Sequence, residues 1–432
     1  MFDRLNALAW SMTKNHKLNR VLNYKKEIGL YFLTRIALIW VLITYFKSTA
    51  FLDDIHMLYY GGTHPLCLIT GSLAGISGTY APLELLIYAP FTAICNSLNG
   101  VRLATFTFEF LTLLMMILIG NKIIKEDTLH KIVLIYILIP LSWVESIVWA
   151  QDEILAALFL LVVLYFKLRD KEDLAALSLG LTCVCSKIIP LIIFVPLLLT
   201  ANNKKKTFLL TILPILAVYL PVNYNYRLLG IGSPFLAQIR LNMPVGSLSI
   251  PYLFKLLTDY PIQWSLLSFI LVSASLLIYY AYLFYKYQKK DIPNFIDMSI
   301  VSFLVCFVFF WQTQPAYYIY ILPILLLRLA MLDKINIKET LLLLILSISS
   351  ITWKVLHLLS CIYQDSSIVA GYAAPNRFLE FHNNLIGNQF FKLEEIIFLV
   401  ITLVIVIRYL IFFLKGHRSL KRGCINEQSS MP

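Results

Sequence analysis

Long apolar runs alternate along this chain with short segments that are rich in lysine and arginine. The apolar runs are roughly 18 to 25 residues long, which is the length that an α-helix needs to cross the hydrocarbon core of a bilayer. We expect ten membrane-spanning helices, over residues 28–46, 101–119, 132–148, 154–168, 208–222, 262–284, 296–311, 317–332, 340–356 and 393–414. The pattern therefore predicts an all-α polytopic membrane protein.

One apolar segment does not fit this alternation. Residues 174–200 have basic residues on both sides, and two full crossings need about 40 residues, which is more than this segment has. The segment is interrupted by Ser186, Lys187 and Pro190. We expect a re-entrant hairpin of two half-helices with Lys187 at its turn, because irregular backbone at membrane depth is tolerated only against protein or a wet cavity.

The basic residues predict how the chain is oriented. Of the 36 lysines and arginines, 25 lie in seven short segments that the alternation places on one side of the membrane. Because positive residues mark cytoplasmic loops, we expect a cytoplasmic basic N-terminus (1–27), one integral-membrane domain (28–414) and a cytoplasmic tail (415–432). The outer loops are expected at 47–100, 223–261 and 357–392, the first with a helix at 82–98 that lies along the membrane interface.

Composition limits where function can be sought. The chain is 59% hydrophobic and 14% charged, so the few polar residues inside or beside the membrane are the candidates. The net charge of +12 comes from loop lysines that face the anionic inner leaflet, so we predict no nucleic-acid partner. The seven cysteines form no metal-binding motif, and no cofactor is predicted, although a divalent metal is left open.

Two aspartates, Asp53 and Asp54, follow the first predicted span at the outer water boundary. A partly desolvated carboxylate has a pKa nearer the useful range for a general base. His56 and Tyr59 follow closely as candidate substrate-binding residues. Two loop aspartates are by default simply solvated, but the outer loops are otherwise poor in acids, which favours a catalytic role.

A polar segment, Trp149 to Glu153, is expected at the outer turn between two spans. Its Gln151, Asp152 and Glu153 lie beside an indole, and this combination can bind a sugar through hydroxyl hydrogen bonds and ring stacking. Acids in the first turn of a helix are also explained by the helix dipole. For this segment taken alone, the dipole is the simpler explanation.

Further candidates lie later in the chain. Lys187 is an intramembrane ammonium suited to phosphate, the alternative being a lysine that extends to an interface. Gln314 and Tyr318 lie at the outer start of a later span, where aromatic residues are usually interface anchors but a glutamine can bind a polar substrate. Arg377 in the last outer loop is a second candidate cation.

In this order the motifs resemble those of the GT-C-type glycosyltransferases, integral-membrane enzymes that use polyprenyl-phosphate sugars. The matching pieces are Asp53-Asp54, Tyr80-Ala81-Pro82-Leu83 with Ala89-Pro90, Trp149-Ala150-Gln151-Asp152 with Leu155, Leu179-Gly180-Leu181 with Ser186-Lys187 and Pro190, and Gln314-Pro315-Ala316-Tyr317-Tyr318 with Leu322-Pro323. The mannosyltransferase-like branch, which includes GPI and bacterial or archaeal polyprenyl-phosphomannose-dependent enzymes, is most similar. Ala150 stands where that family often has glycine, and Gln314 where a histidine is common.

The resemblance implies inverting transfer of a hexose, most readily mannose, from a polyprenyl-phosphate donor to a lipid- or glycan-linked hydroxyl on the outer face. Asp53 or Asp54 would be the base, and Lys187 with Arg377 would bind the donor phosphate. The membrane would be the plasma membrane, or the endoplasmic reticulum in a eukaryote. The alternative is a polytopic transporter or lipid-linked-sugar flippase, in which a broken helix such as 174–200 forms a midplane site.

Overall fold

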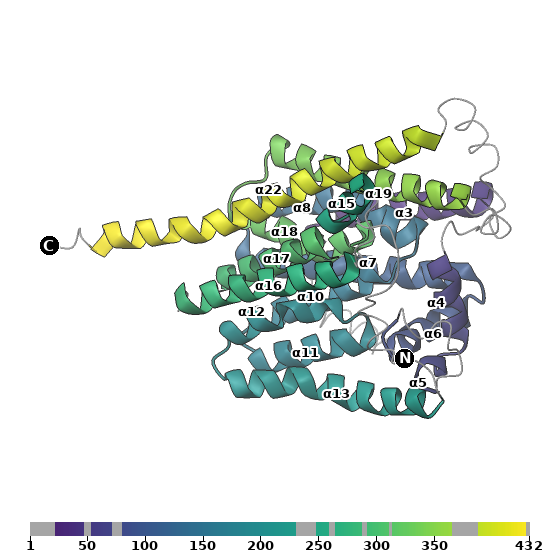
Figure 1. The fold of residues 1–432 in the computed structure, drawn as a ribbon, viewed down its shortest axis with the longest axis horizontal. Helices are drawn as coiled ribbons and strands as arrows, with labels where there is room; N and C mark the ends of the chain where they lie inside the picture. Colours follow the sequence, from purple (N-terminus) through teal and green to yellow (C-terminus); the bar gives the residue numbers. More distant parts are fainter. Residues whose placement is uncertain are drawn as a thin grey trace, which may run out of the picture.

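The computed structural model describes residues 22–46, 53–70, 80–229, 248–258, 264–286, 292–310, 313–364 and 388–428. All regular structure within these ranges is helical, which confirms the predicted fold class. The long helices run side by side along the long axis of the molecule (Figure 1). The short helices α4 (Asp53–Thr63), α5 (Cys67–Thr70) and α6 (Glu84–Ile94) lie at one end of this bundle, and α22 extends past the opposite end.

Seven helices in the described part are long and apolar enough to cross a membrane. They are α3 (Lys25–Phe46), α7 (Leu98–Ile123), α13 (Lys204–Leu228), α16 (Trp264–Lys286), α17 (Ile292–Phe309), α19 (Ile337–Gln364) and α22 (Asn388–Gln428). An eighth candidate is bent by 54° between α8 (Glu126–Leu138) and the pair formed by α9 (Pro140–Trp143) and η1 (Val144–Val148). The chain is therefore a multi-pass membrane protein.

Two of the ten predicted spans are shorter than expected. Residues 154–168 fall in α10 (Glu153–Lys167), and residues 317–332 fall in η3 (Pro315–Tyr317) and α18 (Tyr318–Met331). Both are below the 18 residues of a full span. All ten predicted spans thus contain helix, and the expected bundle is confirmed with one bent member and two short ones. A further short helix, α15 (Ile250–Thr258), packs against α22 and α16.

The bend after α8 has a local cause. Pro140 has no backbone N–H and disfavours helical backbone in the residue before it, so Ile139 is extended at φ −67° and ψ 125°. The chain then forms a wide helical turn in which the N–H of Trp149 donates to the carbonyl of Val144 over 2.9 Å. Such π-turns are frequent at functional sites.

A buried arginine holds this bent segment in place. Arg35 of α3 donates to Glu109 of α7 over 2.6 Å, to the carbonyl of Ile137 over 2.7 Å and to Ser142 over 3.1 Å. Ser146 in turn donates to the other Glu109 oxygen over 2.8 Å. Both charged side chains are almost fully buried, so a charge-assisted network joins α3, α7 and the bent segment inside the bundle.

The expected re-entrant hairpin is present. It consists of α11 (Glu172–Cys185), a break at residues 186–188, η2 (Ile189–Ile193) and α12 (Phe194–Leu199). Its two ends meet, because the N–H of Asn202 donates to Glu172 over 2.8 Å and the Lys167 ammonium donates to the carbonyl of Thr200 over 2.7 Å. The segment therefore returns to the level at which it entered, with Lys187 at the far tip.

Close packing of α11 on α13 requires a glycine. A Cβ atom at Gly180 would clash with the backbone carbonyl oxygen of Thr211. The hydroxyl of Thr211 donates to the carbonyl of Ala176 over 3.2 Å, one turn away on the same face of α11. The glycine of the Leu179-Gly180-Leu181 motif is thus explained by the approach of two helix backbones.

Polar side chains pair with one another at the ends of the helices that are expected inside. Arg328 of α18 donates two hydrogen bonds to the Asp297 carboxylate of α17, over 2.6 and 2.7 Å. Lys206 of α13 bonds Asp173 of α11 over 2.6 Å, and Arg408 of α22 pairs with Glu339 of α19. The candidate site lies at the opposite ends of α10, α11 and α18 from these ion pairs.

Candidate active site

The polar segment from Trp149 to Glu153 is held in one conformation from both sides. The N–H of Gln151 donates to the carbonyl of Glu145 over 2.8 Å, which closes the wide turn. The ammonium of Lys354 from α19 lies 4.1 Å from the centre of the Trp149 ring and 3.3 Å from the Glu145 carboxylate. Ala150 adopts a φ of 49°, the left-handed region that costs a non-glycine residue about 1 kcal/mol.

The centre of the candidate site is an ammonium between two carboxylates. Lys187, at the tip of the hairpin, lies 2.9 Å from Asp152 and 2.6 Å from Glu153. The side chains of the two acids are 3% exposed and that of the lysine is 12% exposed, so a ligand from outside reaches the cluster along the lysine side chain. Opposite charges this close and this buried interact far more strongly than they would in water.

A third carboxyl joins the same cluster from α6. Glu84 is fully buried, accepts a hydrogen bond from the N–H of Ala81 over 3.0 Å and interacts electrostatically with Asp152. The adjacent backbone is tied to the hairpin, because the N–H of Leu83 donates to the carbonyl of Val184 over 2.9 Å. Burial, reinforced by the charge of Asp152, raises the pKa of Glu84 well above its usual range.

Three tyrosines, from η3, α18 and α6, complete the site. The ring centre of Tyr317 lies 6.0 Å from the Lys187 ammonium, and Tyr317 is stacked on Tyr320 with their ring centres 5.5 Å apart. The hydroxyls of Tyr320 and of Tyr88 on α6 are buried and have no hydrogen-bond partner among the described residues. Buried polar groups normally find water or a ligand, so these hydroxyls are available to a polar substrate.

This cluster, comprising Glu84, Asp152, Glu153, Lys187 and the three tyrosines, can act chemically in two ways. A buried carboxylate can take a proton from a hydroxyl, and a neighbouring protonated carboxyl can donate one. The spare hydroxyl and carboxyl oxygens can hydrogen-bond sugar hydroxyls beside aromatic rings. Among the described residues, no group of three or more histidines, cysteines or acids is arranged to hold a metal ion.

Some candidates from the sequence come together here and others do not. Asp152, Glu153 and Lys187 meet directly, and Gln151 is buried in the turn behind them, its amide 3.4 Å from the carbonyl of Trp149. Gln314 precedes η3 and accepts the N–H of Tyr317 at its carbonyl over 3.0 Å.

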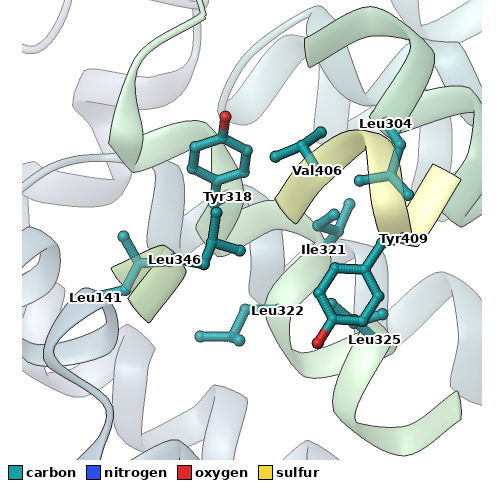
Figure 2. A pocket seen from close by; sticks show the side chains of 9 residues that line it. All are labelled: Leu141, Leu304, Tyr318, Ile321, Leu322, Leu325, Leu346, Val406 and Tyr409. Atoms are coloured by element: carbon teal, nitrogen blue, oxygen red, sulfur yellow. The ribbon is translucent and has the colours of Figure 1, made fainter. Parts of the chain in front are cut away.

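Tyr318 points elsewhere. It lines an apolar crevice between α9, α17, α18, α19 and α22, together with Leu141, Leu304, Ile321, Leu322, Leu325, Leu346, Val406 and Tyr409 (Figure 2). Its ring meets Phe307 edge-on at 5.2 Å. Successive residues of a helix point about 100° apart, so Tyr317 faces Lys187 while its neighbour faces this crevice.

The candidates of the first outer loop lie on α4. Asp53 and Asp54 are its first two residues, with side chains outside the described part, and α4 packs on α6, which carries Glu84. His56 is exposed, and Tyr59 donates to Asn96 over 2.7 Å, so neither contacts Lys187. Arg377 lies outside the described residues.

Three residues of the site were not expected from the sequence, namely Glu84, Lys354 and Tyr320. Glu84 lies in the segment that was expected to form an interfacial helix, and Lys354 lies within the apolar run of residues 340–356. The signal that could have found Glu84 is its place directly after the Tyr80-Ala81-Pro82 motif. Tyr320 is one helical turn beyond Tyr317, so the same face of α18 predicts it.

No known protein family matches the sequence, and no curated protein matches it. Among solved structures, the chain is similar to the crystal structure of ArnT from Cupriavidus metallidurans bound to undecaprenyl phosphate. The similarity covers 82% of this chain and 76% of that one, with 12% sequence identity and a TM-score of 0.43. So distant a likeness assigns no function.

Proposed function

We propose that this protein is a membrane glycosyltransferase that transfers a hexose, most readily mannose, from a polyprenyl-phosphate donor to a hydroxyl of a lipid- or glycan-linked acceptor. One observation carries this conclusion. Motif pieces separated by more than two hundred positions, around Tyr80–Glu84, Trp149–Glu153, Lys187 and Gln314–Tyr317, converge on one cluster of acids, a lysine and tyrosines. Their convergence supports a single site built by those motifs.

The reaction uses the cluster and the start of α4 together. The acceptor hydroxyl loses its proton to Asp53 or Asp54, its oxygen forms a bond to the anomeric carbon, and the bond from that carbon to the phosphate oxygen breaks on the opposite face. The electron pair leaves with the polyprenyl phosphate. Attack opposite the leaving group inverts the anomeric configuration.

In our proposal, the carboxylates of the cluster bind the sugar, and its lysine binds the phosphate. Lys187 forms ion pairs with both Asp152 and Glu153, and the carboxylate oxygens that remain suit the sugar hydroxyls. The donor phosphate approaches the exposed edge of Lys187, and a second cation, for which Arg377 is our candidate, shares its charge. A lipid tail that stays in the bilayer while the sugar enters the cluster requires a site at the membrane boundary, on the outer face in our proposal.

The direct test supplies purified protein in lipid nanodiscs with polyprenyl-phosphate mannose, glucose or arabinose and a crude glycolipid acceptor fraction, and reads products by mass. We expect a product that gains one hexose and depends on the lipid-linked donor. Binding of the donors without any product would instead support the transporter or flippase alternative. Replacing Asp53 and Asp54 singly by Asn should abolish transfer in one case, with Asp173→Asn as the control at the other end of the bundle.

Lys187→Ala provides the second test. Loss of one charge-assisted contact to phosphate should raise the Michaelis constant for the donor about tenfold or more. Lys206→Ala is the matched control, because Lys206 also pairs with an aspartate but is 54% exposed and distant in the fold. Equal donor constants for both variants would remove Lys187 from phosphate binding.

A further inference from the structure

The acid cluster holds more carboxyls than its one ammonium can balance. Glu84, Asp152 and Glu153 are each no more than 2% exposed, and Lys187 is the only cation that forms an ion pair with any of them among the described residues. If all three were ionised, the buried cluster would carry two uncompensated negative charges. Buried charge without compensation is strongly unfavourable, so at least one carboxyl keeps its proton.

The contacts identify the carboxyl that keeps it. Asp152 and Glu153 lie against the Lys187 ammonium at 2.9 and 2.6 Å, which favours their ionised forms. Glu84 forms no ion pair in the described part of the chain. It lies close enough to Asp152 for the two charges to interact, and two buried carboxyls side by side can form a hydrogen bond only if one of them carries a proton. Oε1 of Glu84 and Oδ2 of Asp152 are buried and have no hydrogen-bond partner among the described residues, so a proton placed between them satisfies both.

We propose that Glu84 is a positioning residue that stays protonated and donates a hydrogen bond to the Asp152 carboxylate, which it holds as an anion beside Lys187. The N–H of Ala81 fixes the other Glu84 oxygen, so the donor is aimed by the backbone at the start of α6. This inference rests on the proposed function for its role in transfer, because an oriented Asp152 is what binds the sugar. Tyr88 on α6 and Tyr317 and Tyr320 at the start of α18 are the other titratable groups that face the cluster.

The proton itself can be observed without any substrate. A protonated carboxyl in nanodisc-embedded protein gives an infrared carbonyl band that a carboxylate lacks and that shifts in heavy water. We expect this band at neutral pH in the wild type and in Glu153→Gln, and its loss in Glu84→Gln. A band that survives in Glu84→Gln but disappears in Glu153→Gln would place the proton on Glu153 and overturn the assignment.

Activity then tests the role of the donor. A glutamine amide at position 84 can accept from Ala81 and donate to Asp152 without a titrating proton, so Glu84→Gln should restore most of the turnover that Glu84→Ala loses. Glu84→Ala removes the donor from a buried acceptor and should lower turnover about tenfold or more. Loss of turnover in Glu84→Gln with normal folding would mean that Glu84 must exchange its proton, which contradicts a fixed donor. If the wild type transfers no sugar, the proposed function fails, and the infrared comparison still decides the protonation of Glu84.

Discussion

Two buried arginines show how differently one residue type can be accommodated in this protein. Arg35 and Arg102 are each 1% exposed. Arg35 is paired with Glu109 and also bonds a carbonyl and a serine, so its donors are used. Arg102 donates to Asn99 over 3.0 Å, its Nε atom has no partner, and it forms no ion pair with the described residues.

Replacing each arginine by methionine should therefore affect stability differently. Arg35→Met leaves the Glu109 carboxylate buried without its partner, which should destabilise the protein by about 3–5 kcal/mol. Arg102→Met removes a buried charge that has no counter-ion, so its midpoint of thermal unfolding should stay the same or rise. Thermal unfolding in detergent checks both. A clear fall for Arg102→Met would show that an anion, from the chain or from a lipid, pairs with this guanidinium.

At the residue scale, the sequence predicted members of the site better than their partners. Lys187 was found because it interrupts an apolar run, where a charge is costly, and Asp152 and Glu153 because they lie beside a tryptophan in a polar turn between two predicted spans. Their pairing could not be predicted, since it depends on the rotation and register of α10 against the hairpin. Glu84 and Tyr320 were missed for the same reason. Tyr317 and Tyr318 are adjacent in the sequence, but Tyr317 faces Lys187 and Tyr318 lines the crevice of Figure 2.

At the scale of elements, the position of the site depends on how tightly α11 packs on α13. The hairpin tip carries Lys187. Near the tip, the N–H of Leu83, the residue before α6, donates to the carbonyl of Val184 in α11. Any displacement of α11 therefore moves Lys187 relative to α10. The basic flanks and Pro190 predicted the hairpin, whereas the close approach at Gly180 appears only once α13 is in place.

Gly180→Ala should consequently damage the site from a distance. The added methyl group meets the Thr211 carbonyl, so α11 must move away from α13, and we expect a loss of about 1–3 kcal/mol of stability together with weaker donor binding. Gly29→Ala on α3 is the matched control, because no atom lies within 4 Å of a Cβ at that position. Equal thermal stability of the two variants would contradict the close packing of α11 on α13.

For the whole molecule, the two ends of the bundle differ in chemistry. At one end, arginines and lysines pair with acids at the helix ends, as in Arg328 with Asp297 and Lys206 with Asp173. At the other end lie the acid cluster and the tyrosines. The short helices α4 and α6 lie at this end of the bundle (Figure 1). The alternation of spans predicted this division, because an even number of crossings returns the chain to the same side. The orientation in the membrane rests on the distribution of lysine and arginine alone.

Labelling of single cysteines tests that orientation. In a variant whose seven native cysteines are replaced by serine or alanine, we would introduce cysteine at Asn96, before α7, or at Asn202, after the hairpin; both positions are exposed. With a maleimide that does not cross membranes, Asn96→Cys should react in intact cells, and Asn202→Cys only after permeabilisation. The reverse result would place the acid cluster on the cytosolic side. Since the site would then face soluble nucleotide sugars, a polyprenyl-phosphate donor would lose its physical rationale, whatever the chemistry of the cluster.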